Sequence, residues 1–359
     1  MSQTFFPLDS PIEITPSSTG WVSVNLSSYI PEGATGVVLH FVNTSSSSLQ
    51  VGARKPGDTV LAANYMHASI HTWCMAGVDS NRYVDIYVGD TTYIDVYLVA
   101  YTKSGVTFLN NAVNVSPSTL GSWQDVNLSS YCPNAIGAIF IISGTGTAYT
   151  FGLRKKGSTD NRYSAVYYYN LMGFVVGCDS SQVVQAYSGS TNLKFYLIGY
   201  ITDGAVFNTN ASNVTPGTTG TWVDLSALPS QSVMGFFEMY NSSSTTNLYY
   251  GLRKNGSSED IYKFFKARAY GIVACDGDGI IEGKYSGGSF YLIGYATVPT
   301  PTEATEYLRS QAQVAEMATQ YLLSQMSIAS PAVAVPLEGS SPFLIAKPSL
   351  RSAIRAKAN

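Results

Sequence analysis

One unit of sequence recurs three times along this chain, and the recurrence limits the folds that the chain can adopt. The segment YLVAY at 97–101 returns as YLIGY at 196–200 and again at 291–295. The opening of the unit recurs as well, and it places Trp21, Trp123 and Trp222 about 100 residues apart. Self-similarity at a fixed period is typical of a repeated structural unit. The sequence therefore predicts three copies of one fold.

Two polar residues, an arginine and an aspartate, recur in the same order in each copy. An arginine stands in VGARKPG, FGLRKKG and YGLRKNG, and an aspartate follows about 25 residues later. An arginine and a carboxylate can form a paired, charge-assisted contact. We therefore predict that each arginine has a partner within its own unit, with the aspartate as a candidate. A contact with a sugar, a phosphate or a protein is the alternative. The residues are Arg54, Asp79, Arg154, Asp179, Arg253 and Asp276.

Each unit is built from short segments that alternate apolar and polar residues. GVVLHFVN, YVDIYVG and KFYLIGYIT are examples, and Gly, Ser, Asn or Pro bound them. Alternation at period two between turn residues is typical of β-strands. The sequence predicts an all-β chain of three tandem antiparallel β-sandwich repeats, jelly-roll or immunoglobulin-like, followed by an α-helix and an extended C-terminal arm. The predicted boundaries are 1–104, 105–205 and 206–298 for the repeats, 299–327 for a linker and helix, and 328–359 for the basic arm.

The three tryptophans are candidates for the core of each repeat. Each stands in the predicted first strand, and an indole buries a large apolar area. We expect Trp21, Trp123 and Trp222 to anchor the repeat cores. An exposed aromatic binding platform is the alternative interpretation.

The last 60 residues or so are not repeated, and their composition differs from the rest. Residues 303–327 are rich in Ala, Gln, Glu, Leu and Met, which favour a helix. Apolar residues recur at steps of three, four or seven and form one stripe that a single solvated helix cannot bury. Four prolines interrupt the following arm, in which PFLIA is apolar and the last charges are all positive. We expect this part to order by binding a neighbour. The residues expected to make these contacts are Tyr307, Leu308, Val314, Ala318, Tyr321, Leu322, Phe343, Leu344, Ile345, Arg351 and Arg355.

Composition argues against several functional classes. The net charge is −3, so no general electrostatic attraction to nucleic acid or anionic membrane is expected. No stretch reaches the length of a membrane span, and the N-terminus does not resemble a secretory signal, so synthesis in a cytoplasm is expected. The four cysteines show no recurring pair and are expected to be small buried hydrophobes.

Candidate catalytic and metal motifs are weak. His67 and His71 are four residues apart, a spacing that serves zinc only on a helix with further ligands. CDGDGIIEG at 275–283 lacks the ligand spacing of a calcium-binding EF-hand loop. No nucleophile elbow, phosphate-binding loop or dinucleotide fingerprint occurs. We therefore expect no enzyme activity, no metal and no cofactor.

The whole chain resembles structural proteins of viruses, especially of tailed bacteriophages, in its repeats, low charge, Tyr, Ser, Thr and Gly richness and terminal arm. The resemblance is architectural and is to capsid decoration, head-fibre and tail-fibre proteins built from tandem β-sandwiches. It implies a non-enzymatic component of the virion, located in the particle. Residues 303–359 would bind sister subunits, in a homo-oligomer for which a trimer is one candidate, or other virion proteins.

A carbohydrate-binding adhesin or receptor-binding module is the alternative function. Exposed tyrosines could stack on sugar rings, and AVYYYN at 165–170 and NLYYG at 247–251 supply candidates. Cross-strand aromatic packing is the competing interpretation of the same residues. The candidate glycan contacts are Tyr167, Tyr168, Tyr249 and Tyr250.

Overall fold

The computed structural model describes residues 3–144, 149–166, 172–225, 228–242, 247–265, 267–299 and 312–323. The chain divides into two compact units, Met1–Glu306 and Tyr307–Asn359. The first unit contains strands that recur in the same order in each repeat. The second unit contains a helix over 312–323 in its described part. Among the described residues, no helix combines the length and the apolar character that crossing a membrane requires.

Twenty-four strands are found in the described residues of the first unit. The first repeat contributes β1 (Phe5–Glu13), β2 (Gly20–Asn25), β3 (Gly36–Asn43), β4 (Leu49–Arg54), β5 (Asn64–Met66), β6 (His71–Gly77), β7 (Tyr83–Val88) and β8 (Ile94–Thr102). The second contributes β9 (Val106–Asn114), β10 (Trp123–Asn127), β11 (Gly137–Gly144), β12 (Tyr149–Lys155), β13 (Ser164–Val166), β14 (Met172–Gly177), β15 (Val183–Ser188) and β16 (Leu193–Ile201). The third contributes β17 (Ala205–Asn213), β18 (Val223–Leu225), β19 (Ser232–Tyr240), β20 (Leu248–Lys254), β21 (Lys263–Phe265), β22 (Arg268–Ala274), β23 (Ile281–Tyr285) and β24 (Ser289–Thr297).

The recurring YLVAY and YLIGY segments lie in the strands β8, β16 and β24. Along β8 every second residue, from Ile94 to Thr102, is buried, and β24 alternates in the same way. Side chains of a strand point alternately to its two faces, so one face of these strands packs in the core. Strand β3 is buried at all eight positions because it lies between two neighbouring strands and under a second layer. The prediction of an all-β first part is therefore confirmed.

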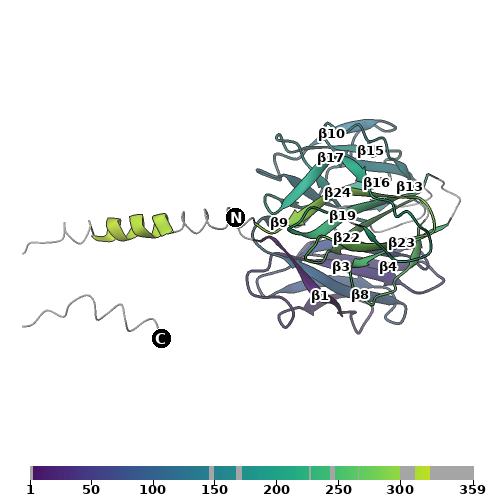
Figure 1. Ribbon diagram of the computed structural model, residues 1–359, viewed down its shortest axis with the longest axis horizontal. Helices are drawn as coiled ribbons and strands as arrows, with labels where there is room; N and C mark the ends of the chain where they lie inside the picture. The colour runs from purple at the N-terminus through teal and green to yellow at the C-terminus, as the bar shows by residue number, and fades with distance from the viewer. Residues whose placement is uncertain are drawn as a thin grey trace, which may run out of the picture. The chain divides into compact units, whose positions relative to one another are not determined.

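The strands form six four-stranded sheets, two from each repeat. The first repeat has the orders β1-β8-β3-β6 and β2-β7-β4-β5, and the other two repeats have the same two orders. All pairings are antiparallel, and the sheets take strands that are not consecutive in the chain. Figure 1 shows the strands β1, β8 and β3 of one sheet together, and the strands β19, β22 and β24 of a sheet of the third repeat together.

The three repeats close into a ring. Strand β6 of the first repeat contacts β14 of the second and β22 of the third, and β14 also contacts β22. The first strand of the second repeat, β9, contacts β3 and β6, and β17 of the third contacts β12 and β14. Strand β1 contacts β19 and so completes the ring. One hydrophobic cluster includes Phe41, Ile139 and Phe236, one residue from each repeat.

The prediction of three tandem β-sandwich repeats is therefore wrong. Six small sheets lie in one compact unit in the manner of a six-bladed β-propeller, so the cores are not three self-contained ones. The physical reason is that the inner strands bury apolar side chains against neighbouring repeats as well as within their own. A repeat on its own would leave this surface exposed, and burial of apolar surface is the main force in folding.

Two close backbone approaches show how tightly the repeats pack. A Cβ atom added to Gly173 on β14 would lie 2.4 Å from the Cα of Cys74 on β6. Gly204, with φ of +73°, begins the third repeat, and a Cβ there would lie 2.5 Å from the buried side chain of Thr4. Both positions need glycine, because a larger residue would clash with a strand of another repeat.

Candidate functional site

The repeated tryptophans lie on the outer sheets and not in the cores. Each indole reaches across one intervening strand to a glycine of the next strand in its sheet, and a Cβ added at Gly52, Gly152 or Gly251 would come within 2.9, 2.5 and 2.6 Å of its ring. All three indoles are half-buried. The prediction that Trp21, Trp123 and Trp222 anchor the cores is therefore wrong, because strands β2, β10 and β18 are edge strands with a partly exposed face.

Each tryptophan covers the repeated arginine of its own unit. The guanidinium carbons of Arg54, Arg154 and Arg253 lie 4.0, 4.2 and 4.2 Å from the indole centroids. A cation over an aromatic face is attracted to the electron-rich ring. This repeated contact fixes the outer sheets, and it explains why tryptophan and arginine recur together.

The partner of each arginine lies directly opposite it on the adjacent strand and is not the predicted aspartate. Arg54 lies 3.6 Å from Asp85, Arg154 donates to Gln185 at 2.9 Å, and Arg253 pairs with Glu282 at 2.7 Å. These partners stand on β7, β15 and β23, in register with the arginines. The prediction of a partner within the unit is thus confirmed, and the choice of Asp79, Asp179 and Asp276 is wrong.

The three aspartates hold turns. The carboxylate of Asp79 accepts hydrogen bonds from the backbone N–H groups of Asn81 and Tyr83. Asp179 accepts from Ser181 and Val183, and Asp276 accepts from Asp278 and Ile280, all at 2.8 to 3.0 Å. An aspartate that caps its own turn satisfies backbone donors that would otherwise lack partners. The bonds at Asp276 close a turn over 276–280, and β23 begins directly after it.

Aromatic side chains gather around the outer-sheet tryptophans. Tyr163 and Tyr187 stack at 4.1 Å with nearly parallel rings, and Trp123 meets Tyr187 edge to face at 5.8 Å. In the first repeat Trp21 meets Tyr87 at 5.6 Å. The indole N–H of Trp123 donates to Asn161 at 2.9 Å. We call these groups, with their arginines, the outer-sheet clusters.

The candidate glycan tyrosines have different positions. Tyr249 is 43% exposed, next to Tyr262. Tyr250 is fully buried, and its hydroxyl donates to the carbonyl of His71 at 3.0 Å, so its prediction as a glycan contact is wrong. The alternation along β20 explains the difference, because neighbouring residues face opposite sides of the sheet. Tyr167 and Tyr168 lie outside the described residues.

A buried histidine pair lies where the first repeat meets the third. His40 Nε2 and His71 Nδ1 are 2.9 Å apart, and His40 stacks on Trp73 at 4.0 Å. The ring of Tyr250 lies 4.2 Å from His71. Burial lowers the pKa of His40 to about 3. Burial, and after it the charge that His40 would carry, hold the pKa of His71 well below its usual value. Both rings are therefore neutral at pH 7.

Sequence reasoning did not find this pair. It considered His67 with His71, but His71 lies on β6 and faces His40 on β3. The pairing register sets the two rings together, since His40 stands opposite Trp73 and His71 opposite Val42. Among the described residues, no group of three or more His, Cys, Asp or Glu could hold a metal ion.

A buried ionic network joins the second and third repeats. The Nε atom of Arg268 donates to Glu238 at 2.6 Å, and its Nη1 and Nη2 atoms donate to the carbonyls of Phe151 and Arg162 at 2.6 and 2.7 Å. Arg162 also pairs with Glu238 at 3.0 Å. Glu238 stands at the register position that His40 occupies in the first repeat. The two clusters thus belong to corresponding strands of different repeats.

The four cysteines are free and buried, as predicted for small hydrophobic residues. Burial raises the pKa of each thiol to about 12. A thiol that keeps its proton is a poor nucleophile and a poor metal ligand. The cysteines therefore contribute packing.

The helix over 312–323 confirms this part of the helix predicted over 303–327, and the rest of that range lies outside the described residues. The large apolar side chains of the helix are exposed, from 54% at Leu323 to 65% at Tyr321. Val314, Met317, Ala318 and Tyr321 share one face, because residues three, four and seven apart lie together on a helix, and Leu322 borders this face. The predicted contacts Tyr307, Leu308, Phe343, Leu344, Ile345, Arg351 and Arg355, and the extended arm over 328–359, lie outside the described residues.

Comparison with known proteins gives weak structural similarities. No family model and no curated protein matches the chain. A protein with a triple jelly-roll fold from the turret assembly of an archaeal virus matches 82% of this chain and 91% of its own length, with 10% identity and a TM-score of 0.20. A chain of the lipid-containing bacteriophage PM2 matches 82% of this chain and 88% of its own length, with 7% identity and a TM-score of 0.14.

A third similarity is to the tandem CBM22-1–CBM22-2 domains of Xyn10C from Paenibacillus barcinonensis. It covers 55% of this chain and 94% of those domains, with 12% identity and a TM-score of 0.14. At such scores the three similarities assign the chain to no family.

Proposed function

We propose that the protein is a non-enzymatic structural component of a virus particle, of the capsid decoration or fibre type. The sheet unit is the displayed body, and residues 303–359 attach it to sister subunits or to other proteins of the particle. The virus assignment rests on the resemblance in repeats and composition described above. The attachment role rests on the helix over 312–323.

The exposed apolar face of this helix is the observation that carries the proposal. Val314, Met317, Tyr321 and Leu322 each expose more than half of their side-chain area. Covering an apolar side chain of this size stabilises a complex by about 1.5 to 3 kcal/mol, before the cost of ordering it. A partner that covers the face therefore gains several such contributions.

The attachment role is tested by comparing the full chain with a variant that ends at residue 306, in sedimentation velocity. We expect the full chain to self-associate and the truncated chain to remain monomeric. The triple variant Val314→Ser, Met317→Ser and Tyr321→Ser should behave like the truncated chain. The control Glu316→Gln with Thr319→Ser changes the opposite side of the helix and should associate normally. Equal sedimentation of the full and truncated chains would contradict attachment between sister subunits.

The particle assignment has its own test. Mass spectrometry of virus particles purified from cells that produce this protein should find it at a stoichiometry of several copies per particle. Its absence from intact particles would refute the assignment, whatever the sedimentation result.

The outer-sheet clusters favour carbohydrate binding as a second candidate function. They place half-buried tryptophan and tyrosine rings beside polar groups, such as Asn161 at Trp123 and Asp260 at Trp222. An aromatic face with flanking hydrogen-bonding groups suits a sugar ring. On a glycan array, Trp123→Ala with Tyr187→Ala should lower binding, whereas the control Tyr93→Ala, at an exposed tyrosine outside the clusters, should not. Lack of binding by the unaltered chain would exclude this function.

A further inference from the structure

The three junctions of the ring differ in strength. At the junction of the first and second repeats, the carboxylate of Asp58 accepts a hydrogen bond from the N–H of Ala112 on β9 at 3.0 Å. The N–H of Thr59 donates to Asn111 at 3.0 Å. Lys55 donates to Asn110 at 2.8 Å. The first strand of the second repeat is thus held by three polar contacts.

The junction of the second and third repeats has corresponding contacts. Asp160 accepts from the N–H of Ala211 on β17 at 2.7 Å. The N–H of Thr159 donates to Asn210 at 2.8 Å, and Lys155 donates to the carbonyl of Phe207 at 3.0 Å. The network of Arg268 and Glu238 adds to this junction.

At the junction of the third and first repeats, a proline stands where the other two junctions have a backbone N–H donor. Ile12 on β1 pairs with Leu98, as Val113 pairs with Leu197 and Ser212 with Leu292. Pro11 therefore stands where Ala112 and Ala211 stand. Proline has no N–H, so the hydrogen bond of the other junctions cannot form. Across this junction the buried hydroxyl of Tyr250 donates to the carbonyl of His71 at 3.0 Å. Lys254 lies 3.8 Å from Asp9, which is fully exposed, and such surface pairs contribute little.

The aromatic packing at this junction also differs from that of the other two. The ring of Phe108 packs against Gly36 and Gly77, and the ring of Phe207 packs against Gly137 and Gly177. Pro7 takes the corresponding place on β1, because it pairs with Ala100 as Phe108 pairs with Gly199 and Phe207 with Gly294. Phe5, which contacts Phe236 at 5.7 Å, is the aromatic residue of β1 that packs into this junction.

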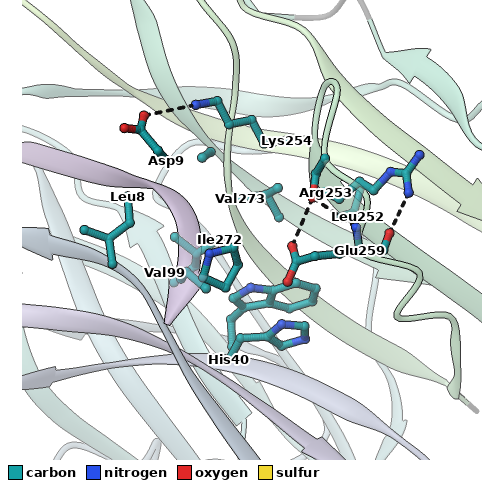
Figure 2. A pocket seen from close by; sticks show the side chains of 14 residues that line it. Leu8, Asp9, His40, Val99, Leu252, Arg253, Lys254, Glu259, Ile272 and Val273 are labelled. Atoms are coloured by element: carbon teal, nitrogen blue, oxygen red, sulfur yellow. Dashed lines mark hydrogen bonds and ion pairs between the residues drawn. The ribbon is translucent and has the colours of Figure 1, made fainter. Parts of the chain in front are cut away.

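A cavity of about 40 Å³ lies at the same junction, lined by residues that include Leu8, Pro11, His40, Trp73 and Glu259. Figure 2 shows Leu8 and Asp9 of β1 opposite Arg253 and Lys254 of β20, with Glu259 below Arg253 and His40 lower still in this view. A space of this size can hold a water molecule beside polar groups. His40 of the neutral pair therefore lines a cavity that can hold water.

We propose that the ring opens at the junction of the third and first repeats, and that protonation of His40 and His71 favours the open state. This device goes beyond the proposed attachment role and does not depend on it. Closed, the junction buries two neutral imidazoles against Trp73 and Tyr250, where a positive charge is costly. Open, it exposes them to water, where they take up protons below pH 6.5.

Other charged and titratable groups face the pair from the surrounding elements. They are Tyr97 on β8, Tyr250, Arg253 and Lys254 on β20, Glu259 after β20, Lys263 on β21 and Asp9 on β1. Lys263 makes a second positive charge at His71 less favourable. Burial raises the pKa of Glu259, so its protonation favours the closed state and opposes the histidines in part.

Thiol labelling at two equivalent valines tests the proposal. Val273 on β22 lines the cavity at the third and first repeats, and Val176 on β14 lines the cavity at the second and third. Both are buried and hold the same register position. Full-length Val273→Cys and Val176→Cys variants are labelled with a thiol reagent active at pH 5 to 7. Mass spectrometry of peptides gives a protection factor relative to an unstructured cysteine peptide at each pH.

At pH 7 we expect position 273 to be labelled roughly tenfold faster than position 176, since about two hydrogen-bond contributions are missing there. On lowering the pH to 5, protection at 273 should fall by on the order of tenfold or more, since His40 alone contributes about twentyfold. Position 176 should keep its protection.

Two further variants complete the test at position 273. His40→Ile with His71→Leu should abolish the acid response, and Pro11→Ala should slow labelling about fivefold by restoring one donor. Equal labelling at the two positions, or an equal acid response at both, would overturn the proposal. An acid response at 273 that survives the loss of both histidines would overturn it as well.

Discussion

Acid should destabilise this protein in a pH range that the buried histidines determine. In the unfolded chain His40 takes up a proton near its ordinary pKa of 6.5, whereas in the folded chain burial lowers its pKa to about 3. Between these values the unfolded state binds one proton more, so the free energy of unfolding falls by about 1.4 kcal/mol per pH unit. From pH 7 to pH 4.5 the loss from His40 is about 2 to 3 kcal/mol.

His71 acts in the same direction, because burial also lowers its pKa. The carboxyl groups with lowered pKa, such as Asp276, lose their contribution only below pH 4, and the raised pKa of Glu259 works in the opposite sense. Between pH 6.5 and 4.5, the change in the free energy of unfolding therefore comes mainly from the histidine pair.

Urea unfolding followed by tryptophan fluorescence at pH 7, 6, 5 and 4.5 measures this loss. The double variant His40→Ile with His71→Leu should give a much flatter dependence on pH, whatever its stability at pH 7. The first replacement copies Ile141, which holds the same register position in the second repeat. The control His67→Gln should keep the slope of the unaltered chain. An unchanged slope in the double variant would refute the reasoning.

Three further predictions concern packing, charge and attachment. Gly173→Ala should lower the free energy of unfolding by about 1 to 3 kcal/mol, because its Cβ would meet β6, whereas the exposed control Gly217→Ala should change it little; chemical unfolding checks both. Glu238→Gln should lower the free energy of unfolding by about 3 to 5 kcal/mol, because it leaves the buried Arg268 without its counter-charge. Glu282→Gln, at a partly exposed pair, should lower it clearly less. Equal losses in chemical unfolding would contradict the assigned network. Leu322→Ser in the full chain should weaken self-association in sedimentation, and Thr319→Ser should not.

The strands were predictable from the sequence because their signal is local. The alternation in YLVAY and YLIGY depends on residues two apart, and the structure has β8, β16 and β24 at these places. The helix over 312–323 also follows from local composition and spacing. The arginine, tryptophan and glycine of each repeat recur because they form one contact on each outer sheet.

The closure of the ring was not predictable in this way. Alternation along a strand gives it two faces but does not say which face a second layer covers. The large apolar area of Trp21, Trp123 and Trp222 therefore predicts core positions, although their strands lie on the outer sheets. Contacts such as Gly173 with Cys74, or His40 with His71, depend on the register between strands far apart in sequence. Three similar repeats also suggest three similar cores, whereas one hydrophobic cluster of the structure contains buried residues from all three repeats.

The shared core of the ring is the claim on which the folding and opening arguments depend. Differential scanning calorimetry of the full chain at pH 7 tests it most directly. A single closed ring should unfold in one transition whose calorimetric and van't Hoff enthalpies agree. Three separable transitions, or a calorimetric enthalpy about three times the van't Hoff value, would show independent repeats and contradict the closed ring.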